Sequence, residues 1–199
     1  MPEQYATVMA LSAARAQIAS PGAAAARAGD FATARERYAR LLAWDPGATE
    51  ARLDVAETFR LEGRRDDAEK LHRRAIEIRR TRLAANHPDL AESLNNLGVL
   101  LTDEGRFDEA EALFAEALAI RTTALGEQHS AVAEVLGNQG ALAFARGRYA
   151  EAEQLQRKAL AIEAAAHGAD DPAVAFALHN LAQVLMAQGK AADAVIQLE

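Results

Sequence analysis

Five histidines are the side chains in this sequence best suited to binding a metal ion or transferring protons. They occupy positions 72, 87, 129, 167 and 179. His87 and His129 stand in two similar turns, each followed by a similar run of apolar residues. We therefore expect them to lie side by side along the fold rather than to converge on one ion. The simpler interpretation is that both belong to turns and helix starts, so the sequence predicts no metal site.

No motif for catalysis or cofactor binding accompanies the histidines. The chain has no cysteine, and it lacks HExxH, GxSxG and a glycine-rich phosphate loop. Acid pairs such as Asp66 and Asp67 flank expected helix ends, where a carboxylate in the first turn favours the helix dipole. We therefore predict no catalytic residue, no cofactor, and a protein that is not an enzyme.

Three asparagines, Asn96, Asn138 and Asn180, recur at the same interval that separates His87 from His129. A primary amide both donates and accepts hydrogen bonds, so a row of amides can bind the backbone of an extended peptide whatever its side chains are. Alternatively, each asparagine bonds to a neighbouring helix and orients the fold. The sequence leaves both interpretations open, and they are compatible.

The asparagines recur because a longer segment recurs with the same period. The segment Leu97–Ile120 returns as Gln139–Ile162, and it begins once more at Leu181. An earlier copy covers Val55–Ile78. A fixed period of this length indicates a stack of helical repeats, because one helix pair cannot bury its own apolar stripe.

Two helices per repeat, A and then B, follow from the spacing of apolar residues. The clearest helix A stripe is Leu90, Leu94, Leu97 and Leu101. A glycine stands between helix A and helix B of each repeat, where a left-handed residue ends a helix. These glycines are Gly29, Gly63, Gly105, Gly147 and Gly189.

Small residues predict how the two helices of a repeat meet. Gly98 and Gly140 are equivalent positions on helix A, and Ala110 and Ala152 are equivalent positions on helix B. Such residues allow two helix backbones to approach closely. His72 takes the place of an aromatic residue on an earlier helix B.

Composition limits the classes of partner. The net charge of −7 disfavours nucleic acid, because phosphate contacts need clustered lysine and arginine. No apolar run reaches the roughly 18 residues of a membrane span. The N-terminal residues carry an acid where a signal peptide carries positive charge, so we expect them to be mature structure. We therefore expect a soluble, cytoplasmic protein without a membrane partner.

The pattern of Leu-Gly on helix A, Gly-x-Tyr/Phe at the turn and Ala-Leu on helix B resembles the tetratricopeptide repeat. The long period resembles the kinesin light chain type, whose long helix B precedes a Gly-x-x-His-Pro-like turn. Here those turns end at His87-Pro88, His129-Ser130 and Asp171-Pro172. The sequence departs from the pattern at Pro21, at Gln139 and Ala143, and at Leu198 and Glu199, where the last helix B stops early.

The resemblance implies an all-α fold, a right-handed α-solenoid of stacked antiparallel helix pairs. We expect residues 1–28 to form N-terminal capping helices. Residues 29–199 would form an array of four to five repeats, with the last one truncated.

In this family helix A lines a concave groove, and the kinesin light chain group uses asparagines there to hold an extended peptide. The resemblance therefore implies that the groove binds a segment of a partner protein. The expected partner-binding residues are Glu92, Asn95, Asn96, Glu134, Gly137, Asn138, His179, Asn180 and Gln183.

The charge of the expected groove indicates the class of ligand. Chaperone-binding members of the family clamp a C-terminal carboxylate with lysine and arginine on helix A, and that clamp is missing here. Glu92 and Glu134 instead favour a neutral, apolar or basic segment over an acidic tail.

Two further features bear on partners. The basic stretch between Arg64 and Arg82 contains acids at helical spacing, so we interpret it as a helix face with internal ion pairs. The truncated last repeat suggests an alternative function, a structural or self-assembling scaffold that associates as a homo-oligomer through its open terminal face. Association of this kind would respond to Leu181, Leu185 and Leu198.

Overall fold

The computed structural model describes residue 22, residues 24–45 and residues 48–190, and in these ranges every regular element is an α-helix. The helices fall into two compact units, Met1–Arg82 and Leu83–Glu199. Most of the predicted capping region 1–28, including Pro21, lies outside the described residues, as do Leu198 and Glu199.

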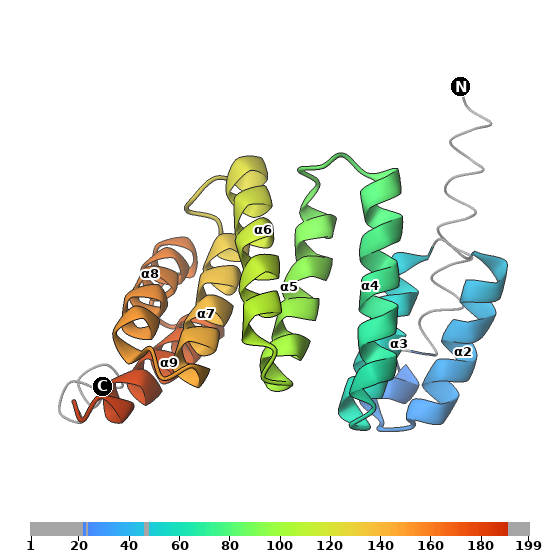
Figure 1. The fold of residues 1–199 in the computed structure, drawn as a ribbon, viewed down its shortest axis with the longest axis horizontal. Coiled ribbons are helices and arrows are strands. Elements are labelled where there is room, and N and C mark those ends of the chain that lie inside the picture. Colours follow the sequence, from blue (N-terminus) through green and yellow to red (C-terminus); the bar gives the residue numbers. More distant parts are fainter. Residues whose placement is uncertain (1–21, 23, 46–47, 191–199) are drawn as a thin grey trace. The chain divides into compact units, whose positions relative to one another are not determined.

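The first unit contains α2 (Phe31–Trp44), α3 (Thr49–Leu61) and α4 (Arg65–Arg82). Helix α3 packs against both α2 and α4 (Figure 1). Ala34, Tyr38 and Leu41 of α2 form a buried cluster with Ala51 and Val55 of α3. These residues recur at helical spacing, so one apolar face of each helix builds the core.

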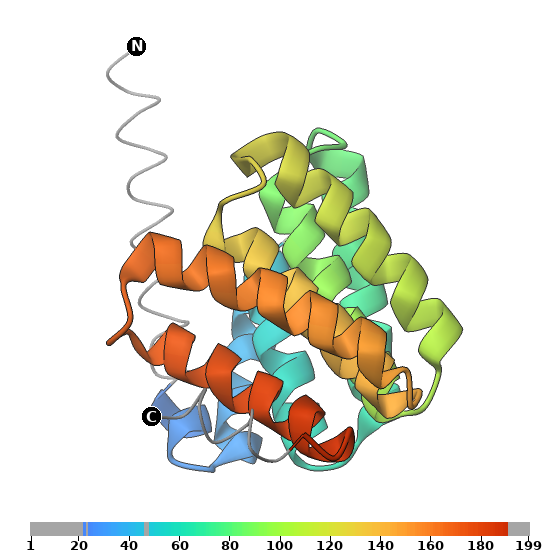
Figure 2. The same cartoon turned by 90° about the vertical axis from the view of Figure 1, so that its left-hand side faces the viewer.

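The second unit contains α5 (Pro88–Asp103), α6 (Phe107–Leu125), α7 (Ser130–Ala145), α8 (Tyr149–His167) and α9 (Pro172–Ala187). Each of these helices packs against the next one in the chain. Figure 2 shows the last two, α8 in orange and α9 in red, lying side by side. We call α3, α5, α7 and α9 the A helices and α4, α6 and α8 the B helices. The fold is the predicted all-α solenoid of stacked helix pairs.

Glycine ends helix A as predicted. At Gly105 the backbone has φ 76°, a conformation that costs glycine little. The next amide, of Arg106, then donates back to the Leu101 carbonyl over 2.9 Å. This geometry closes the end of α5 and starts α6 within a few residues.

The turn residues before the A helices act as N-caps. Nδ1 of His87 accepts a hydrogen bond from the Asp89 amide, and Nδ1 of His129 accepts one from the Ala131 amide over 3.1 Å. Oδ1 of Asp171 does the same for Ala173 over 2.8 Å. The prediction that both histidines belong to turns and helix starts is confirmed, because each satisfies an amide that the helix leaves unpaired.

The core of the second unit follows the predicted stripe. Leu90, Leu94, Leu97 and Leu101 are all buried. Gly98 leaves room for a ring, because a Cβ added there would lie 2.6 Å from the ring of Phe114. Gly140 likewise leaves room for the side chain of Gln156, the residue equivalent to Phe114.

His72 stands at the same position one repeat earlier and is 5% exposed. Its Nδ1 is buried and has no hydrogen-bond partner among the described residues. Burial lowers the pKa of His72 to about 4, because the charged imidazolium would lose its hydration. The prediction that His72 replaces a core aromatic residue is confirmed.

Ion pairs line the exposed B helices and the turns. Arg64, just before α4, pairs with Asp67, and Arg73 of α4 pairs with Glu69, which confirms our interpretation of the basic stretch. Between repeats, Arg146 pairs with Asp108, and the amide of Gln188 donates to the Tyr149 carbonyl over 2.9 Å. In the described part of the chain, no helix has both the length and the apolar character needed to span a membrane.

Candidate functional site

All nine residues predicted to bind a partner lie on the A helices of the second unit. Helix α5 carries the first three, α7 the next three and α9 the last three. We call the surface of α5, α7 and α9 that bears them the helix A face. The residues on this face differ in how much of each side chain is left for a ligand.

Asn95 is not open to a ligand, contrary to expectation, since it is only 1% exposed. Its Nδ2 donates to Oε1 of Glu134 over 2.9 Å, and its Oδ1 accepts from Nδ2 of Asn138 over 2.9 Å. These two bonds join α5 to α7. Asn138 therefore bonds to a neighbouring helix, as in the alternative in which an asparagine orients the stack. Its amide still has a second donor hydrogen and an acceptor oxygen.

Glu134 belongs to the same chain of hydrogen bonds. Nη1 of Arg121 on α6 donates to Oε2 of Glu134 over 2.8 Å and to the Ala131 carbonyl over 2.6 Å. Arg121 is only 5% exposed, so its charge is largely withdrawn from solvent. It partly neutralises Glu134, which therefore adds less negative charge to the helix A face than expected. Sequence reasoning missed Arg121, although Arg79 holds the equivalent position one repeat earlier.

Asn96 and Asn180 are partly buried, and their side-chain amides form no hydrogen bond with any described residue. These two equivalent positions, two repeats apart, keep donors and acceptors available. Glu92 is exposed on α5. On α9, His179 and Gln183 are exposed, and Nε2 of the histidine lies 2.9 Å from Nε2 of the glutamine.

A cavity of about 320 Å³ opens between α7, α8 and α9. It unites four of the predicted residues: Glu134, Gly137, Asn138 and Asn180. It also includes Phe176 of α9, together with Gln156 and Glu163 of α8, which sequence reasoning missed. Gly137 contributes no side chain and so widens the opening.

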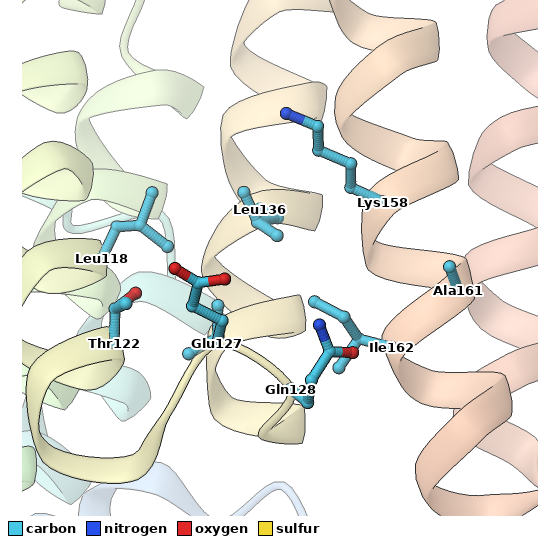
Figure 3. A pocket seen from close by; sticks show the side chains of 9 residues that line it. Leu118, Thr122, Glu127, Gln128, Leu136, Lys158, Ala161 and Ile162 are labelled. Carbon is cyan, nitrogen blue, oxygen red and sulfur yellow. The ribbon is translucent and has the colours of Figure 1, made fainter.

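A second hollow of about 410 Å³ lies between the B helices α6 and α8. Figure 3 shows Leu118 and Thr122 on one side, Lys158 on the other, and Leu136 of α7 between them. The carboxylate of Glu127 also lines this hollow. Because its polar groups include one cation and one anion, the hollow shows no preference for the sign of a ligand's charge.

Within the described ranges, no group of three His, Cys, Asp or Glu side chains has an arrangement that could hold a metal ion. Ser130 and His167 lie 2.8 Å apart, from Oγ to Nε2. The same histidine nitrogen lies 3.4 Å from Oε2 of Glu163.

A family model described as tetratricopeptide repeat matches the chain three times, at residues 48–123, 89–163 and 131–199. No curated protein matches the sequence.

Solved structures share the fold. The crystal structure of BtubC (BKLC) from P. vanneervenii has a TM-score of 0.85 and 26% identity, with 98% of this chain and 80% of that chain covered. A Podosopora anserina putative kinesin light chain with nearly identical TPR-like repeats has a TM-score of 0.74 and 20% identity, covering 92% and 90%. MamA has a TM-score of 0.61 and 18% identity, covering 92% and 87%.

Proposed function

Since the chain belongs to the tetratricopeptide repeat family, with long repeats of the kinesin light chain-like type, we propose that its helix A face binds an extended segment of another protein. Repeats of this family generally mediate protein–protein interaction or scaffolding, and the family is typically non-enzymatic. We propose the same for this chain, a binding module that catalyses no reaction. Its cytoplasmic location stays a prediction.

The observation that carries the proposal is the pair of amides at Asn96 and Asn180, which form no hydrogen bond with a described residue. Both belong to the second unit and occupy the same position of helix A, two repeats apart. An amide left without an internal bond can donate to a peptide carbonyl and accept from a peptide amide. Asn138 stands between them in sequence and keeps part of its own hydrogen-bonding capacity.

The charge of the helix A face supports a neutral or basic ligand. Helices α5, α7 and α9 contain no lysine or arginine, whereas Glu92 is exposed on α5. A segment with several acidic residues would therefore find no cation on these three helices. Small residues at Gly137 and Ala141 leave room for side chains of the ligand.

The self-assembling scaffold receives no support from the leucines expected to mediate it. Leu181 and Leu185 are fully buried and pack with Leu160 of α8. They are therefore part of the fold rather than an exposed contact surface. Leu198 lies outside the described residues.

A selection of random peptides displayed on phage tests the proposal. Selected peptides would be measured for affinity to the wild-type chain, to an Asn96→Ala/Asn180→Ala variant, and to a Gln154→Ala control, which removes an exposed amide from α8. Asn138 stays unchanged because it bonds to Asn95. We expect the double variant to lose about ten-fold or more in affinity, since each lost hydrogen bond is worth about 1 kcal/mol. Equal affinity for all three proteins would overturn the proposal.

A further inference from the structure

Four departures from the repeat pattern meet at the cavity between α7, α8 and α9. In each case the residue differs from the one at the equivalent position of the preceding repeat. Gly137 stands in place of Asn95, Gln156 in place of Phe114, Glu163 in place of Arg121, and Phe176 in place of Glu134. All four of the later residues line the cavity. The cavity is therefore the place where this repeat differs in chemistry from the one before it.

The exchange of Arg121 for Glu163 removes an internal cation. Arg79 and Arg121 occupy this position in the two earlier repeats, and both are buried. Arg79 donates to Oε1 of Glu50 over 3.1 Å and Arg121 to Oε2 of Glu134 over 2.8 Å, so each bonds to a carboxylate on an A helix. In the last described helix pair, the equivalent position carries Glu163, a shorter and acidic side chain.

Two buried oxygen atoms near this position receive no hydrogen bond from any described residue. Oε2 of Glu163 and Oε1 of Gln156 are both buried and have no hydrogen-bond partner among the described residues. Gln156 is only 2% exposed, and its Nε2 is already used by the Gly137 carbonyl over 2.9 Å. His167 lies 3.4 Å from Glu163 and forms an ion pair with it only when protonated. Buried acceptors of this kind cost stability unless a donor reaches them.

An aromatic ring completes the surroundings. Phe176 takes the position at which Glu134 binds Arg121, and it is 67% exposed at the cavity. A large apolar side chain that is exposed in this way offers a face on which a planar cation can stack.

We propose that this cavity binds the side chain of an arginine from the partner segment. The partner's guanidinium would lie where the preceding repeat holds the guanidinium of Arg121, with Phe176 against its face and Glu163 and Gln156 as acceptors. This inference rests on the proposed function, because the arginine would arrive on the segment that the helix A face binds. It also gives that segment one required side chain.

Arginine suits the cavity better than lysine. The guanidinium carries five N–H donors in one plane, so it can reach two separate acceptors while its face contacts a ring. An ammonium group has three donors around one point and holds its hydration more strongly. A neutral side chain of the same shape would lose the attraction to Glu163.

The probe for the test is N-acetyl-arginine N-methylamide, added to the full chain with backbone amides followed by NMR. We expect saturable shifts centred on Gly137, Phe176 and Asn180. The citrulline analogue, a neutral isostere, should bind about ten-fold more weakly, because charge-assisted hydrogen bonds are about twice as strong as neutral ones. Equal shifts with the citrulline analogue, shifts centred elsewhere, or no shifts up to about 50 mM probe would overturn the proposal.

Variants separate the cavity from general effects of charge. Glu163→Gln and Phe176→Ala should each weaken arginine binding by about five-fold or more, as loss of a charged acceptor or of a cation–π contact implies. Glu127→Gln is the matched control, because it removes one carboxylate at the other hollow. Phe176 is exposed, so its replacement should leave the fold intact even if changes at Glu163 do not. Unchanged binding by Phe176→Ala would contradict the proposal.

A double variant, Glu163→Arg/Phe176→Glu, restores the pair seen at Arg121 and Glu134. We expect it to fold at least as stably as the wild type and to lose the arginine probe. If it still binds the probe at the cavity, the proposal is wrong. The phage selection reports independently: peptides that depend on Asn96 and Asn180 but not on arginine or Glu163 would leave the groove in place and remove the arginine site.

Discussion

Asn138 of α7 donates a hydrogen bond from its Nδ2 to Oδ1 of Asn95 on α5, over 2.9 Å. Asn95 in turn donates to Glu134, which accepts from Arg121. Four polar side chains from three helices thus bond to one another, and two of them, Asn95 and Arg121, are buried. This chain of hydrogen bonds supports the helix A face, whereas Asn96 and Asn180 do not take part in it.

Replacing Asn95 should therefore destabilise the protein. Asn95→Ala leaves Asn138 and one oxygen of Glu134 without their partners, and we expect a loss of about 1–3 kcal/mol in the free energy of unfolding. Urea unfolding followed by circular dichroism measures it. Asn96→Ala is the control and should change stability by less than about 0.5 kcal/mol, because its amide forms no hydrogen bond with a described residue. A loss of equal size in both variants would contradict the role of the chain.

Adding one methyl group at Gly98 should be costly. The new Cβ would lie 2.6 Å from the Phe114 ring, which is buried. We expect Gly98→Ala to lower the unfolding free energy by about 1–3 kcal/mol, the usual cost of overpacking. Combining it with Phe114→Leu should recover part of this loss. A lack of recovery would show that the ring is not the obstacle.

Stability should fall as the pH is lowered through the window set by His72. Its folded pKa, about 4, lies below the value of 6.5 expected when unfolded, so the unfolded chain binds the proton more tightly. The contribution of His72 is fully present above pH 6.5 and is lost as the pH falls towards 4. Between pH 7 and pH 5 we expect a loss on the order of 2 kcal/mol.

A His72→Leu variant isolates this effect, since leucine does not titrate and suits a buried site. Thermal melts at pH 7 and pH 5 should show a smaller difference for the variant than for the wild type. Glu153 acts in a separate window. Its hydrogen bond from Lys190 lowers its pKa to about 2, so its contribution is present above pH 4.5 and fades below that. Equal pH dependence of the wild type and the His72→Leu variant would contradict the assignment to His72.

The N-cap of α9 gives a further prediction. Asp171→Ala removes the acceptor for the Ala173 amide and should cost about 1 kcal/mol in unfolding free energy. Asp170→Ala is the matched control, because this neighbouring acid is exposed and its side chain forms no hydrogen bond or ion pair with a described residue. Urea unfolding of the two variants decides the matter, and equal stability would show that the cap contributes nothing.

The sequence predicted the helices and their ends well, because each is determined by a few nearby residues that recur. Gly105 and His129 illustrate this, since the turn and the cap need only local contacts. The burial of Asn95 escaped prediction because its bond to Asn138 joins two neighbouring repeats at positions that are not equivalent. Periodicity identifies equivalent residues, but it does not show which non-equivalent residues touch.

The cavity between α7, α8 and α9 could likewise be predicted only in part from the repeats. Glu163 could have been noticed by aligning the repeats, since it stands where Arg79 and Arg121 stand earlier. Gln156 lies on the same face of α8, but the nearness of Phe176 depends on how α8 packs against α9, and that requires the structure.

The charge reversal at Glu163 also bears on the register of a bound segment. Asparagines at equivalent positions of three successive repeats offer similar backbone contacts, so a segment held by them alone could shift from one repeat to another. A single cavity with its own chemistry breaks this translational symmetry. It would let the array hold a segment at one fixed position along its length.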